Sequence, residues 1–164
     1  MSLHPQVIPP IPDETARVAH AILPKGNVYM HMRDELGTIY QDQDFADLFP
    51  QRGQAAEAPW RLALVTVIQY AEGLTDRQAA DAVRTRIEVK YALSLDLTDT
   101  GFDFSILSEF RSRLLAAGAE RRLFDLLLEQ LSTRGWIKAR GKQRTDSTHV
   151  LVSATVMDRP DCKL

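Results

Sequence analysis

The segment Pro59–Tyr70 constrains the fold more than any other part of the chain. Pro59 suits the first turn of a helix, where its missing amide donor costs nothing. The apolar residues that follow surround nearly the whole circumference of that helix: Leu62, Ala63, Leu64, Val65, Val67, Ile68 and Ala71. A helix that is apolar on every side must be covered by other elements. The sequence therefore predicts a helical bundle with this segment at its centre.

Further helices are predicted on both sides of the central one. Apolar residues at helical spacing indicate helices that begin near residues 13, 29, 75, 87, 106 and 123. Thr75 followed by Gln78 is typical of a capping box, in which side chain and backbone bond reciprocally. Four prolines in residues 1–12 remove amide donors, so we expect an arm there without regular structure that packs late or not at all.

The helical pattern stops before the end of the chain. From Lys142 to about Val156, enrichment in Thr and Val predicts strands instead. The expected fold is therefore mainly α, a helical bundle followed by a β-strand or hairpin. The expected divisions are a Pro-rich arm over 1–12, a helical domain over 13–135, and the start of a second domain over 136–164.

The net charge of −2 conceals an uneven distribution. Residues 1–104 carry 9 Lys/Arg against 15 Asp/Glu, whereas residues 105–164 carry 11 against 7. The basic part favours a polyanionic partner, and the acidic part argues against a protein that simply coats nucleic acid. Five cations without an acid among them predict a DNA-backbone contact: Arg134, Lys138, Arg140, Lys142 and Arg144. A solvated linker between two domains explains the same pattern equally well.

Localisation is expected to be cytoplasmic. The longest apolar stretch, Leu62–Ile68, falls well short of the roughly 20 residues that span a bilayer. Residues 1–12 lack the charged and apolar regions of a secretory signal. A single cysteine, Cys162, excludes an internal disulfide and fits a reducing compartment.

Asp146 lies in a polar, β-prone segment, Arg144–Val150. An Asp on a central strand can hold Mg²⁺ against a phosphate, as two-metal phosphoryl transfer requires. A surface Asp bonded by its neighbours Ser147 and Thr148 is the alternative. His149 would point to the opposite face of such a strand and is not expected to share a metal with Asp146.

The segment Tyr70–Arg86 has the outline of a helix-turn-helix unit. A tight antiparallel helical hairpin produces the same pattern. We favour the hairpin, because Glu72, Asp76 and Asp81 dilute the positive charge that a recognition helix needs. Four arginines around Gly118 could extend a basic surface: Arg111, Arg113, Arg121 and Arg122.

Five blocks carry a resemblance to a known family: Ala58–Val65, Glu72–Arg84, Lys90–Leu93, Ser108–Leu114 and Arg144–Val150. Together they resemble the N-terminal region of bacterial insertion-sequence transposases of the DDE type, from the group with an InsH-like N-terminal domain. The resemblance extends over about residues 25–152. It implies that the helical region precedes an RNase H-like α/β domain, whose first strand carries the first of three metal-binding acids.

By position, that first acid is Asp146, which the resemblance implies to be both a catalytic residue and a ligand of Mg²⁺ in the intact parent enzyme. The family's second Asp and its Glu have no counterpart in this chain. We therefore expect a truncated RNase H-like domain that holds no metal tightly and is inactive in DNA cleavage by itself.

The function implied by the resemblance is that of an N-terminal fragment of a DNA transposase. Such a fragment would bind the DNA ends of the element and assemble protomers, either as a homo-oligomer or by pairing with intact transposase. The alternative is a non-enzymatic helical module, either a DNA-binding regulator that uses Thr75–Arg86 or a dimerisation unit.

Overall fold

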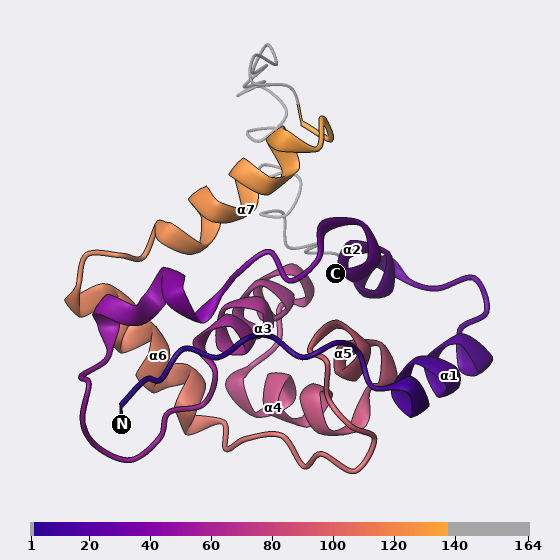
Figure 1. The fold of residues 1–164 in the computed structure, drawn as a ribbon, viewed down its shortest axis with the longest axis horizontal. Coiled ribbons are helices and arrows are strands. Elements are labelled where there is room, and N and C mark those ends of the chain that lie inside the picture. Colours follow the sequence, from indigo (N-terminus) through magenta and orange to yellow (C-terminus); the bar gives the residue numbers. More distant parts are fainter. Residues whose placement is uncertain (1, 138–164) are drawn as a thin grey trace, which may run out of the picture.

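The computed structural model describes residues 2–137, and within them every regular element is a helix (Figure 1). The elements are α1 (Asp13–Ile22), α2 (Val28–Leu36), the 3₁₀ helix η1 (Asp42–Leu48), α3 (Pro59–Glu72), α4 (Asp76–Thr85), α5 (Ile87–Ala92), α6 (Ser105–Ala116) and α7 (Arg122–Thr133). The predicted helical bundle is confirmed over this range. The strands predicted from Lys142 onward lie outside the described residues.

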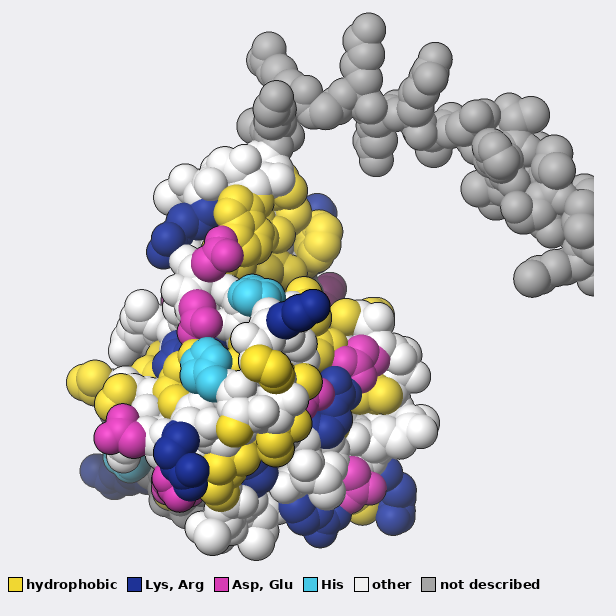
Figure 2. Space-filling view, turned by 90° about the vertical axis from the view of Figure 1, so that its right-hand side faces the viewer, with side chains coloured by type: hydrophobic (Ala, Val, Ile, Leu, Met, Phe, Trp, Pro, Cys, Tyr) yellow, Lys and Arg dark blue, Asp and Glu magenta, His cyan; other side chains and the backbone are white. Residues whose placement is uncertain are grey.

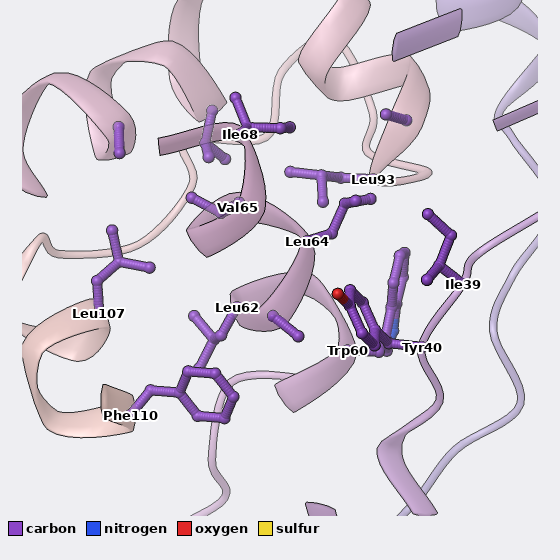
Figure 3. Close-up of a cluster of buried hydrophobic side chains, with 14 of the residues drawn as sticks. Ile39, Tyr40, Trp60, Leu62, Leu64, Val65, Ile68, Leu93, Leu107 and Phe110 are labelled. Atoms are coloured by element: carbon purple, nitrogen blue, oxygen red, sulfur yellow. The ribbon is translucent and has the colours of Figure 1, made fainter. Parts of the chain in front are cut away.

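Helix α3 occupies the centre of the bundle, as predicted. Ala63 is fully buried, and Val65 and Ile68 are each 2% exposed. Side chains of α3 point toward different neighbours, with Leu62 toward Phe110 and Val65 toward Leu107 (Figure 3). Side chains from several elements therefore share one core around this helix.

The two ends of α3 are fixed in different ways. Gly73 ends the helix in the left-handed conformation, with a φ of 66°. At the beginning, Ala58 provides no side-chain cap. The carboxylate of Asp42, on η1, takes that role: it accepts the Trp60 amide at 3.3 Å and the Gln6 amide at 3.4 Å. One buried carboxylate thus joins the N-terminal arm, η1 and the positive end of the central helix.

The predicted capping box opens α4. The Gln78 amide donates to Thr75 Oγ1 at 3.3 Å, and the Thr75 amide donates to Gln78 Oε1 at 2.8 Å. Behind it, the small residues Ala79, Ala80 and Val83 are buried, as expected for a helix that packs closely on α3. The sequence therefore specified both the start and the inner face of α4.

The loop between α5 and α6 is held by a buried lysine. Lys90 is only 4% exposed, and its Nζ donates to the backbone carbonyls of Asp96 and Asp99. These two oxygens replace the water that an ammonium group requires, so the charge can be buried. The loop is thereby held against α5, the helix that α1 and α2 also contact.

Helix α1 begins at Asp13, as expected, with Pro12 at the N-cap position, and its last residue, Ile22, is 61% exposed. One sequence expectation needs correction. The N-terminal arm lacks helices, as expected, but its start is packed: Ser2 forms a parallel bridge with Ala55, and Leu3 is buried.

Candidate nucleic-acid interface

Of the five residues predicted to contact DNA, Arg134 alone lies within the described part of the chain. Arg134 follows α7 directly and is exposed, and Trp136, two residues later, is half-exposed. Lys138, Arg140, Lys142 and Arg144 lie outside the described residues, and so does the predicted metal ligand Asp146. Their predicted roles therefore stay predictions.

The segment that resembles a helix-turn-helix unit has its basic side chains already engaged. Arg84 pairs with Asp81 on its own helix. Arg86 contacts Glu72 at 2.6 Å. Arg77 lies 4.2 Å from the ring centre of Phe104. A recognition helix needs such side chains free to reach base edges, so these contacts support the hairpin interpretation.

An ionic network at the turn between α3 and α4 joins three helices. Arg111 of α6 donates to Asp76 Oδ2 at 2.7 Å, and Gln69 of α3 donates to Asp76 Oδ1 at 2.7 Å. The hydrogen bond from Arg111 is the main reason that the pKa of Asp76 lies below its ordinary value. Arg111 is thus a structural residue of the bundle.

Two more of the arginines grouped as a basic surface also form internal pairs. Arg113 contacts Glu109 at 2.6 Å and lies over the ring of Phe49. Arg122 forms two hydrogen bonds with the carboxylate of Asp47, at 2.6 and 2.9 Å, which lower the pKa of that group. Among these four arginines, Arg121 alone is exposed and unpaired within residues 2–137.

These pairings decide where a polyanion can be held. Residues 2–137 contain 14 Lys/Arg against 19 Asp/Glu, and seven of those arginines form ion pairs. The exposed cations without an ionic partner in this range are few and scattered: Lys25, Arg52, Arg77, Arg121 and Arg134. The helical body therefore offers no concentrated positive surface.

Tyr29 of α2 and Glu72 of α3 are titratable residues held in a hydrogen-bonded network with Arg86. Tyr29 donates to Glu72, which also accepts from Arg86, and burial followed by the Glu72 contact raises the pKa of Tyr29 to about 12. A phenol held in this way is a poor proton donor near neutral pH. In the part of the chain that the structure describes, no group of His, Cys, Asp and Glu side chains could hold a metal ion.

A second surface feature lies between α3 and α7. It is an apolar groove of about 440 Å³, lined by Thr66, Val67, Tyr70, Glu120, Leu123, Phe124 and Leu127. Tyr70 is 84% exposed and Phe124 is 60% exposed. Hydrophobic side chains gather at the height of α7, above the rest of the described body (Figure 2).

The sequence predicts a helix that begins near residue 123 but does not predict the groove beside it. The two walls of the groove come from segments at least fifty residues apart, and only the fold places Tyr70 beside Phe124. One signal was present: Leu123, Phe124, Leu126, Leu127, Leu128 and Leu131 cover more of the helix than one buried face requires.

Comparison with known proteins identifies one family. A family model described as a transposase domain (DUF772) matches residues 17–113. Comparisons with curated proteins and with solved structures gave no significant match. Across residues 2–137, every helix is too short or too polar to traverse a bilayer.

Proposed function

Because this chain belongs to the transposase domain family DUF772, and so has a role in DNA transposition, we propose that its helical bundle presents a DNA-binding segment. The proposed segment is Arg134–Arg144, which begins where α7 ends. In this view, the bundle is a scaffold that sets the position of the segment, and the segment binds the DNA backbone at the ends of the element.

One observation carries this proposal: most arginines of the bundle form internal ion pairs. Arg86, Arg111 and Arg122 each neutralise acids on neighbouring elements. Since electrostatic affinity for DNA depends on cations that displace counterions from phosphates, a paired arginine contributes little. The five basic residues of Arg134–Arg144 have no acid among them in sequence, and Trp136 could stack on a base or anchor the loop.

The proposal extends to the chemistry of the intact parent enzyme. There, Asp146 supplies one oxygen ligand to Mg²⁺ in an RNase H-like domain of the DDE type. A carboxylate is the kind of hard oxygen donor that Mg²⁺ prefers, and a metal-bound water followed by a 3′-hydroxyl would attack the phosphodiesters. This part rests on the resemblance of Arg144–Val150 to the family's first catalytic strand.

The DNA-binding part is tested by titrating duplex DNA with the protein at several salt concentrations. Each phosphate contact contributes roughly 0.9 to the slope of log K against log salt. The triple variant Lys138→Ala, Arg140→Ala, Lys142→Ala should therefore flatten the slope by about 2 to 3 units. The matched variant Arg77→Ala, Arg84→Ala changes the charge on α4 and should leave the slope nearly unchanged.

The opposite ranking would refute the scaffold proposal. It would place the DNA-binding surface on α4 and favour the alternative, a non-enzymatic DNA-binding regulator. If neither the wild type nor the variants bind DNA at low salt, the segment has no DNA-binding role and a dimerisation or assembly module is favoured. Circular dichroism of each variant establishes that the fold is intact before the slopes are compared.

A further inference from the structure

Helix α7 carries an apolar stripe that the rest of the described chain covers only in part. No residue of α7 is fully buried, although Leu123, Leu127 and Leu131 are partly buried and pack against the core. Phe124 extends the stripe on the outer side and faces the groove shared with Tyr70. Soluble monomers rarely expose a continuous apolar surface of more than a few hundred Å². The stripe is therefore expected to have a partner.

The charges at the two ends of this stripe indicate which partner fits it. Glu120 precedes Leu127 by seven residues, and Arg134 follows Leu127 by seven. Seven residues are about two helical turns, or roughly 10 Å, so both charges lie near the same face as Leu127. Both side chains are exposed and form no ion pair within residues 2–137.

The helical register extends close to both charged residues. Arg121, directly after Glu120, and Arg134 itself have right-handed helical backbone angles. The stripe is thus negative at one end, apolar in the middle and positive at the other. A surface of this kind is complementary to a reversed copy of itself.

We propose that α7 pairs antiparallel with α7 of a second copy of this chain, about a two-fold axis beside Leu127. In that arrangement, Leu127 lies against its counterpart and Leu123 lies opposite Leu131. Glu120 of each copy lies opposite Arg134 of the other, so the same ion pair forms twice. A two-fold interface demands this self-complementarity, whereas a parallel pairing would place equal charges side by side.

The groove adds apolar area to this interface. Tyr70 and Phe124 together expose roughly 300 Å², given that an aromatic side chain buries about 150 to 250 Å². The partly exposed leucines of α7 add to this area, which counts toward the roughly 800 Å² per partner of a standard interface. Glu120 is the one charged residue that lines the groove, and its negative charge argues against DNA as the occupant.

The pairing is tested by a charge exchange in the full 164-residue chain, without DNA. Glu120→Arg and Arg134→Glu should each raise the dimer dissociation constant about tenfold, because each replaces two attractions with two repulsions. The double variant E120R/R134E re-forms both pairs in reversed polarity and should return the constant to within about threefold of the wild type. Sedimentation equilibrium measures all three constants.

Glu129→Arg is the matched control. It makes the same charge change as Glu120→Arg, but on the far side of α7, and should leave the dissociation constant unchanged. The second variant is Phe124→Asp. Because Phe124 is exposed, this variant should be a monomer that keeps its helical circular dichroism. A wild type that stays monomeric at all accessible concentrations overturns the proposal. A dimer indifferent to Phe124→Asp, or a double variant as weak as the singles, also overturns it. In the dimer, Arg134 is paired across the interface, and Lys138, Arg140, Lys142 and Arg144 remain for the DNA backbone. Because the measurement contains no DNA, none of these outcomes depends on whether that segment binds DNA.

Discussion

At the scale of single residues, Ile68 shows most directly what the central helix contributes. It is 2% exposed and projects from α3 into the core (Figure 3). We predict that Ile68→Ala lowers the free energy of unfolding by about 2 to 5 kcal/mol, through lost burial and the cavity left behind. Urea denaturation measures the change.

Leu115→Ala is the control for this measurement. Leu115 lies on α6 but is 66% exposed, so its truncation should change the free energy of unfolding by no more than about 0.5 kcal/mol. Equal losses for the two variants would show that Ile68 is not a core residue.

The burial of Ile68 follows from the sequence, but the roles of the charged residues do not. An all-round apolar helix can be recognised from spacing within a dozen residues. Asp42 accepts an amide 18 residues away, and Arg122 contacts an acid 75 residues away. Such partners are brought together by the fold alone, which is why the sequence grouped Arg122 with a basic surface and the structure places it in an ion pair.

At the scale of elements, Asp76 determines how α3, α4 and α6 respond to acid. Its pKa lies below the ordinary value of 3.8, chiefly because of Arg111. The stabilisation is fully present above the unfolded pKa and is lost as the pH falls through the lower, folded pKa. We predict that Asp76→Asn destabilises the protein by about 1 to 2 kcal/mol at pH 7, and that its difference from the wild type shrinks below pH 3.8.

Urea unfolding at pH 7, 5 and 3 tests this dependence. Asp81→Asn removes an exposed acid that pairs within α4 alone, so it should cost about 0.5 kcal/mol or less at pH 7. A difference between Asp76→Asn and the wild type that stayed constant from pH 7 to 3 would mean that the Asp76 carboxylate does not stabilise the junction.

The sequence predicted where the helices lie along the chain but not how they contact one another. The Thr75–Gln78 box marked the start of α4, because a capping box acts locally. The incomplete burial of α7 was not foreseen. Its apolar pattern indicates only that one face should be buried against another surface. Whether the same chain provides that surface depends on how all the preceding elements fold.

At the scale of the whole molecule, the N-terminal arm and the connector at 51–58 hold each other in place. The Ser2 amide donates to the Gln54 carbonyl at 2.6 Å, and the Ala56 amide donates to the Ser2 carbonyl at 2.9 Å. We predict that deleting residues 2–9 destabilises the protein by roughly 1 to 3 kcal/mol and speeds proteolytic cleavage within 51–58, since several backbone bonds are lost together.

Limited proteolysis followed by mass spectrometry locates the cleavage. Val7→Ala serves as the control, because Val7 is 95% exposed and its truncation should leave the cleavage rate unchanged. Equal rates for the deletion and the wild type would show that the arm does not protect the connector. The contact between the arm and the connector was not predicted, because the prolines indicate only that the arm lacks regular structure. They do not indicate which residues the arm contacts.

The polar bonds that tie α7 to the other elements all fall at its beginning, within the described residues: Arg122 contacts Asp47 and the Asp44 carbonyl, and the Leu123 carbonyl accepts from Tyr40. A helix of twelve residues is about 18 Å long. Because the polar bonds hold one end of α7 and apolar contacts of its leucines hold the remainder, a tilt of a few degrees at Arg122 moves Arg134 by ångströms. Small changes around Asp47 would therefore redirect the chain that leaves the far end.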